Sequence, residues 1–166
     1  YSKGQWAPSL NYYNGKFYLN FIAYNHETVN DGGDFMLSTD DPEGTWQMQK
    51  VDGFYYDSGF LFDNDGKVYV AHGINNITVS QVDPNAAFKT VTEKTVIKAG
   101  DKGLEGCHFY HIGDYYYIYA TYNTELSQTI FRSTNPLGPY EEHSGRVFEG
   151  QRIHQGGLVE TQTGEW

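Results

Sequence analysis

The sequence contains a single cysteine, Cys107, so an internal disulfide is impossible and a cysteine-rich metal site is excluded. Basic residues are also scarce: 11 Lys and Arg stand against 21 Asp and Glu, which gives a formal net charge of −10. Because an acidic chain repels phosphate backbones, we expect no nucleic-acid partner, whereas neutral sugars remain compatible. No apolar run approaches the ~20 residues of a membrane span, so we expect no membrane partner.

Signals for helices and for cellular location are missing too. No stretch has convincing helical periodicity, whereas 15 Tyr and 19 Gly favour strands and tight turns in one all-β domain. The chain starts at Tyr1 without Met and stops at Trp166 within an expected strand. We therefore expect a piece cut at both ends, whose compartment and oligomeric state the sequence leaves unknown.

A repeat with a period near 50 residues organises the chain. Residues 6–21, 57–73, 105–121 and 154–166 each combine an apolar or aromatic strand, a turn with glycine and a second strand. Asn-Gly and Asp-Gly in the first two turns are strong hairpin signals. The separations between successive turn glycines are 51, 47 and 51 residues; these glycines are Gly15, Gly66, Gly113 and Gly164.

Further strands complete each repeat. Third strands are expected at 34–39, 77–82 and 128–133, and fourth strands at 47–51, 90–97 and 146–148. Four antiparallel strands per ~50 residues are typical of a β-propeller blade. The sequence thus predicts an all-β, incomplete propeller over residues 1–166, with about three full blades and the start of another. The alternative is a β-sandwich with accidental glycine spacing.

Inner strands of a propeller line its axial channel, so equivalent positions of successive repeats converge. Trp6, Asp57, Glu105 and His154 lie 9, 9, 8 and 10 residues before their turn glycines and form one predicted ring. Two carboxylates suit glycoside hydrolysis, in which one acid protonates the leaving oxygen and the second raises its pKa. An aromatic ring at the same level offers a platform on which a sugar can stack.

Each of these residues also has a structural interpretation. Glu105 can be a solvated turn acid, Asp57 a turn cap and His154 a satisfied core histidine. Trp6 can be a core residue, and Cys107 a packing residue of the inner strand or a pocket wall. The shared phase of the repeat favours the functional interpretation.

Four segments carry a family resemblance: WAPSL at 6–10, DSGFLFDNDGKVYV at 57–70, KGLEGCHFYHIGDYYYIYATY at 102–122 and IHQGGLVETQTGEW at 153–166. In order and spacing they resemble glycoside hydrolase family 43, with the β-xylosidase and α-L-arabinofuranosidase branches as the best match. The resemblance implies a five-bladed propeller, with 1–52 as the second blade, 53–101 the third, 102–150 the fourth and 151–166 the start of the fifth.

The resemblance also implies an activity: inverting removal of terminal β-xylosyl or α-L-arabinofuranosyl units from plant cell-wall xylan or arabinoxylan. Glu105 in the LEG motif matches the general acid, and Asp57 the acid that tunes and orients it. The general base of the family is an Asp of the first blade, to which no residue here corresponds. A fragment without this base should be inactive alone.

Trp6 and Ala7 match residues beside the first sugar subsite, and we assign Tyr56, Cys107 and His154 to substrate binding with them. No cofactor is expected to be required. His154 also matches a histidine at the propeller centre that is associated only indirectly, through its surroundings, with an axial calcium ion in many members. A structural calcium is therefore possible there.

Two departures and the alternative functions complete the prediction. Ser58-Gly59 stands where the family usually has Pro-Ser, which is expected to loosen the aim of Asp57. Ser9 after WAP favours the exo-acting branches over the endo-arabinanases. The runner-up function is a carbohydrate-binding propeller without catalysis, which does not need both acids in one ring. A purely structural or protein-interaction propeller is the third alternative.

Overall fold

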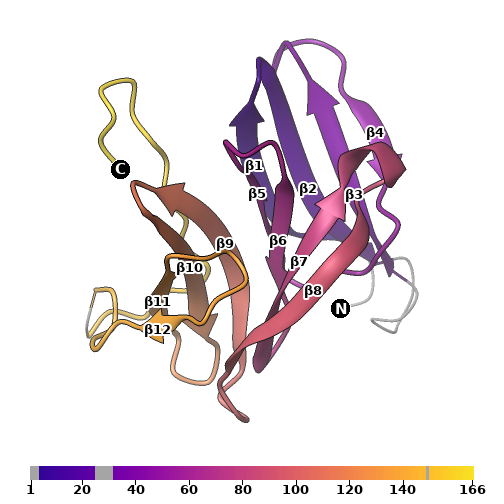
Figure 1. Ribbon diagram of the computed structural model, residues 1–166. Helices are drawn as coiled ribbons and strands as arrows, with labels where there is room; N and C mark the ends of the chain where they lie inside the picture. Colours follow the sequence, from indigo (N-terminus) through magenta and orange to yellow (C-terminus); the bar gives the residue numbers. More distant parts are fainter. Residues whose placement is uncertain (1–3, 25–31, 149) are drawn as a thin grey trace.

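The computed structural model describes residues 4–24, 32–148 and 150–166, and the fold is all-β. Its strands form three four-stranded antiparallel sheets, and the first strand of the middle sheet lies against the first strands of the other two (Figure 1). Each sheet is a meander in sequence order, which is the predicted propeller-blade arrangement. Within the described ranges, no helix is long and apolar enough to cross a membrane.

The first sheet contains β1 (Gly4–Tyr13), β2 (Lys16–Tyr24), β3 (Gly32–Thr39) and β4 (Gln47–Lys50). The second contains β5 (Gly59–Phe62), β6 (Val68–His72), β7 (Asn76–Asp83) and β8 (Lys89–Lys98), with a short 3-10 helix, Pro84–Ala86, before β8. The third contains β9 (Leu104–Ile112), β10 (Tyr115–Tyr122), β11 (Ser127–Ser133) and β12 (Glu141–Glu142). The predicted third strands are confirmed by β3, β7 and β11; which blade of a closed propeller each sheet forms stays a prediction.

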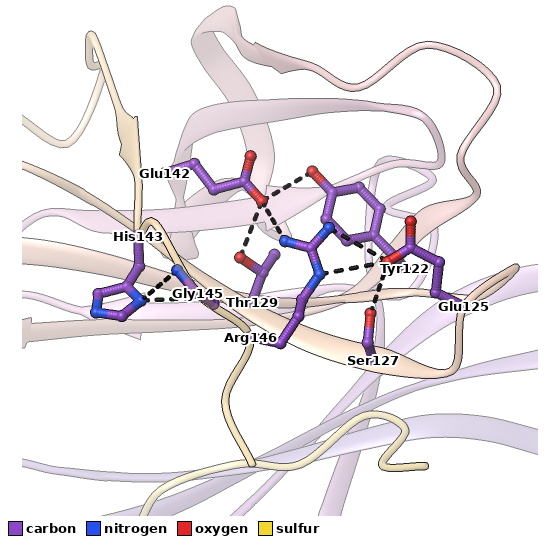
Figure 2. Close-up of polar contacts among 8 residues, drawn as sticks. All are labelled: Tyr122, Glu125, Ser127, Thr129, Glu142, His143, Gly145 and Arg146. Atoms are coloured by element: carbon purple, nitrogen blue, oxygen red, sulfur yellow. Dashed lines mark hydrogen bonds and ion pairs between the residues drawn. The ribbon is translucent and has the colours of Figure 1, made fainter. Parts of the chain in front are cut away.

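The predicted fourth strand of the third sheet is wrong. The outer strand is β12, and Val147 of the predicted strand 146–148 forms an isolated bridge with Gln128. Figure 2 shows the reason: the Arg146 guanidinium is drawn between Glu142 and Glu125, with N–O distances of 3.0 and 3.2 Å. It also lies 4.4 Å from the ring centroid of Tyr122, so this stretch packs through its side chain rather than through a ladder.

The inner strand predicted at 154–166 is also not observed. This segment contains a turn but no strand. The backbone N–H groups of Gln155 and Leu158 donate to side-chain oxygens, Thr121 Oγ1 at 2.8 Å and Tyr110 Oη at 2.7 Å. Because these groups bond to side chains instead of a neighbouring backbone, no ladder forms here.

The inner strands β5 and β6 of the middle sheet are buried on both faces. Successive residues of β5 point to opposite sides, so Phe60 packs in a cluster with Met36 of the first sheet and Leu61 in a cluster with Phe109 of the third. Burial on both faces explains why β6 begins Val-Tyr-Val-Ala without polar alternation. Two apolar layers therefore hold the three sheets together.

A close approach of two inner strands positions the site. A Cβ on Gly59, at the start of β5, would lie 2.5 Å from Cys107 O and 2.7 Å from His108 Cα on β9. Only glycine fits this gap. The approach lets the Cys107 N–H donate to the carbonyl oxygen of Asp57 at 2.9 Å, which fixes Asp57 beside β9.

Candidate active site

Left-handed residues recur once per repeat, near the start of each inner strand and in the segment after the third sheet. Ala7, Asp57, Gly106 and Gln155 have φ values of 47°, 47°, 66° and 51° and follow one another at intervals of 49 or 50 residues. The pairing of β1 with β2 and of β9 with β10 shifts register at this point, so both strands contain a bulge there. Non-glycine residues in this conformation store strain, which is tolerated where the bulge aims a functional side chain.

The recurrence of positive φ corrects the level assigned to Asp57. By this recurrence Asp57 is equivalent to Gly106, whereas Glu105 is equivalent to Trp6, Tyr56 and His154. The count from the turn glycines is off by one because hairpin loops differ in length. The β5–β6 loop consists of residues 63–67, whereas the β1–β2 loop consists of residues 14–15 and the β9–β10 loop of residues 113–114.

The structure nevertheless brings the two predicted acids together. Asp57 and Glu105 are each 5% exposed, at the start of neighbouring inner strands. The charge on Glu105 contributes to a raised pKa of Asp57, so the two carboxyls interact. Asp57 lines a cavity of about 250 Å³, together with Ala7, Pro8, Ser58, Gly106, Cys107, His108 and Gln155.

Opposing influences act on Asp57. Burial, followed by the charge on Glu105, raises the pKa of Asp57 to about 6. The charge on His154 and hydrogen bonds from the Gln155 side chain and the Gly106 N–H favour the ionised form and limit the rise. The Gln155 bond is well formed, with Nε2 donating to Asp57 Oδ2 at 2.9 Å.

Glu105 has fewer donors. Burial raises its pKa, and a long hydrogen bond from the Tyr56 hydroxyl, 3.5 Å from Oε2, works against the rise. The His154 Nε2 lies 3.7 Å from Glu105 Oε1. Repulsion disfavours ionising both carboxyls at once, and the charge on Glu105 accordingly raises the pKa of Asp57.

Some of the predicted substrate-binding residues line the cavity, and others contact Glu105. Ala7 and Cys107 line the cavity, whereas Tyr56 and His154 contact Glu105. Trp6 is half-buried on β1 and is not among the residues that line this cavity. Burial raises the pKa of the Cys107 thiol, so Cys107 suits the cavity wall rather than a nucleophile.

The calcium expectation finds no set of ligands in the described part of the chain. No group of three or more His, Cys, Asp and Glu there is arranged to hold a metal ion. The His154 Nε2 faces Glu105, and calcium prefers a cage of six to eight oxygens. A structural calcium therefore stays a prediction, and no chemical step below depends on it.

Sequence reasoning missed two supports of Asp57. One is Gln155, an uncharged neighbour of His154 in the HQGG motif, whose only signal was that motif. The other is buried Ser58, whose carbonyl and hydroxyl oxygens each accept from the Asn20 amide at 3.2 Å. Ser58 is thus anchored, and Gly59 next to it lies against β9. The looser aim of Asp57 stays a prediction.

Comparison with known proteins shows the family of the chain. The sequence profile described as Glycosyl hydrolases family 43 matches residues 1–166. The chain belongs to this family.

Curated members of family 43 differ in their names. The chain is 34% identical over 144 residues to a non-reducing end α-L-arabinofuranosidase of Bacteroides ovatus, covering 83% of the chain and 27% of that protein. It is 28% identical to a β-xylosidase of Bacillus subtilis, covering 99% and 36%. An extracellular endo-α-(1→5)-L-arabinanase of Bacillus subtilis is 24% identical, covering 100% and 56%. The chain thus spans about a third of the length of the first two.

Solved family 43 structures have the same arrangement of sheets. A bifunctional protein of Bacteroides eggerthii matches with a TM-score of 0.81 at 29% identity, over 99% of this chain and 22% of that one. A protein of Bacillus licheniformis matches with a TM-score of 0.81 at 28% identity, over 99% and 36%. The three sheets are therefore blades of the family 43 propeller.

Proposed function

We propose that the complete protein containing this chain is an inverting glycosidase. It removes terminal β-xylosyl or α-L-arabinofuranosyl units from xylan, arabinoxylan or their oligosaccharides. The observation that carries the proposal is the buried pair of interacting carboxyls, Asp57 and Glu105, beside a cavity where the inner strands begin. The names of the β-xylosidase and arabinofuranosidase relatives support the substrate class.

The electrostatic cost of the pair favours catalysis over simple sugar binding. A buried carboxylate without a cationic partner costs stability. In the ranges that the structure describes, Glu105 is paired with His154, and neither Glu105 nor Asp57 is paired with Lys or Arg. A propeller that only binds sugar needs platforms and hydrogen-bond donors but not two destabilising acids.

The proposed chemistry follows from the two acids. Glu105 gives its proton to the leaving oxygen as the glycosidic C–O bond breaks. Water attacks the anomeric carbon from the opposite face and loses its proton to a base outside this chain, across a carboxyl gap of roughly 6.5–9.5 Å, so the configuration inverts. Ionised Asp57 keeps the neighbouring Glu105 protonated to higher pH.

Replacing the acid tests the proposal. In the complete protein, Glu105→Gln keeps the shape but removes the proton, so kcat/KM on xylobiose or on arabinofuranosyl oligosaccharides should fall about 10²–10⁴-fold. On 2,4-dinitrophenyl glycosides, whose leaving group departs without a proton, the fall should be much smaller. Glu43→Gln, at an exposed turn, is the matched control and should keep wild-type rates.

Two outcomes would contradict the proposal. Full activity of Glu105→Gln on the unactivated substrates would remove Glu105 as the acid. A wild-type protein that binds these sugars without hydrolysing them would leave the carbohydrate-binding propeller as the function.

A further inference from the structure

Gln155 reaches Asp57 from a distant part of the chain. It lies 98 residues away in sequence, and its Nε2 donates to Asp57 Oδ2 at 2.9 Å. Its backbone is fixed independently, because its N–H donates to the buried Thr121 Oγ1 at 2.8 Å. The backbone of Gln155 is thus fixed to β10, while its side-chain amide points to one carboxylate oxygen of Asp57.

Gly106 provides the space for this side chain. A Cβ on Gly106 would lie 2.5 Å from Gln155 Cγ and 3.1 Å from its Cδ and Nε2, and the φ of +66° itself favours glycine. The glycine that follows Glu105 in the LEG motif is therefore explained by the Gln155 side chain that packs over it. The Gly106 N–H also hydrogen-bonds the Asp57 carboxylate.

Several titratable groups surround the Asp57 carboxyl. Glu105, Cys107 and His108 face the site from β9, His154 from the segment that carries Gln155, and Tyr56 from its own loop. Glu105 receives one long bond at 3.5 Å, whereas Asp57 receives a short amide bond and a backbone N–H. Donors to a carboxylate favour its charged form, so the Gln155 and Gly106 bonds oppose the rise in the Asp57 pKa that burial and the charge on Glu105 cause.

We propose that Gln155 is a positioning residue that holds Asp57 in its ionised form and thereby keeps the catalytic proton on Glu105. The inference rests on the proposed function, because only an acid that must donate its proton needs this asymmetry. Gln155 does not touch the reacting atoms in this proposal and acts through Asp57.

The test uses Gln155→Met in the complete protein. Met has nearly the length of Gln, so it keeps the volume over Gly106 while removing the donor. We expect kcat/KM on unactivated disaccharides to fall about ten- to hundredfold, the range of a hydrogen bond to a charged group. On 2,4-dinitrophenyl glycosides the change should stay within about threefold. The acid limb of the kcat/KM profile should move to higher pH, because ionised Asp57 loses its donor.

Gln155→Glu and Gln162→Ala complete the series. Gln155→Glu preserves shape but adds repulsion, so its acid limb should move further than that of Gln155→Met. Gln162→Ala removes an exposed amide of the same segment and should change neither rate nor profile. Melting curves followed by circular dichroism check that each variant is folded.

The outcomes separate this inference from the proposed function. If Glu105→Gln loses activity as expected while both Gln155 variants keep the wild-type acid limb, the role of Gln155 is overturned and the function stands. Equal losses on activated and unactivated substrates would also overturn it, because they would indicate a structural role. If Glu105→Gln keeps full activity, the proposed function itself fails.

Discussion

Among the residues that the structure describes, three buried carboxyl groups have a pKa above the usual range: Asp34, Asp57 and Glu105. Burial is the largest cause for each, because the charged form loses its hydration. The charge on Glu105 acts on Asp57, which lines a cavity, whereas Asp34 accepts the Tyr55 N–H and so anchors the loop that leads to Asp57. A raised pKa therefore marks both the site and a support of the site.

Asp34 gives a prediction for stability against pH. Burial, opposed by the Tyr55 N–H, raises its pKa from 3.8 to about 7 in the folded protein. The folded state then holds a proton that the unfolded state releases, so the contribution of Asp34 to the free energy of unfolding is full below pH ~3.8. It declines as the pH rises towards about 7, by ~1.4 kcal/mol per pKa unit, or on the order of 4 kcal/mol in all.

Asp34→Asn stays neutral and removes this dependence. Thermal unfolding of the complete protein should show the melting temperature of Asp34→Asn rising relative to wild type between pH 4 and 7. If the melting temperatures of Asp34→Asn and wild type change in parallel between pH 4 and 7, the raised pKa of Asp34 is contradicted.

Sequence and structure diverge most at single residues. Asp57 and Glu105 were predictable because carboxylates at nearly the same phase of a repeat carry a chemical signal. Gln155 was not, because an amide has no charge signature and its partner lies 98 residues away. The level of Asp57 was misjudged by one residue because a turn glycine does not mark where a bulge lies when loop lengths differ.

At the scale of elements, the approach of β5 to β9 sets the geometry of the site. Gly59 faces backbone atoms of Cys107, His108 and Phe109, none of which can rotate away. Any side chain at this position has to push the two inner strands apart. The same displacement would stretch the bond from the Cys107 N–H to Asp57 O.

Gly59→Ala should therefore weaken both fold and site. We expect a loss of about 1–3 kcal/mol in the free energy of unfolding from overpacking, together with lower kcat/KM. Gly145→Ala is the control, since a Cβ there meets nothing closer than the His143 ring at 3.8 Å. Denaturant unfolding and kinetics of both variants in the complete protein measure these effects. Equal free energies of unfolding and equal kcat/KM for the two variants would refute the close approach of β5 to β9.

The elements themselves followed from simple signals where those signals were strong. Apolar alternation and turn glycines predicted β3, β7 and β11 within two residues at each end. β12 was not predicted because it consists of two charged residues, Glu141 and Glu142, which show no alternation of apolar and polar residues. The inner strand expected at 154–166 matched the repeat in sequence, but its backbone groups bond to Thr121 and Tyr110 side chains instead of a strand.

At the scale of the whole molecule, contacts between sheets make distant acids neighbours. β5 is tied to the third sheet at both ends. Before it, Asp57 O accepts the Cys107 N–H; after it, Asp63 Oδ1 lies 2.6 Å from His111 Nδ1, and Asp63 Oδ2 accepts the Tyr116 hydroxyl at 2.7 Å. The position of Asp57 relative to Glu105 is therefore a property of the packed sheets, not of either loop.

The central claim is that the Asp57 and Glu105 carboxyls interact at one site, so that an ionised Asp57 keeps Glu105 protonated. The most direct measurement is a carboxyl ¹³C NMR titration of Glu105 in the complete protein, wild type and Asp57→Asn. We predict a pKa of Glu105 above its usual range in wild type that falls when Asp57 is made neutral. An unchanged pKa of Glu105 in Asp57→Asn would contradict the account.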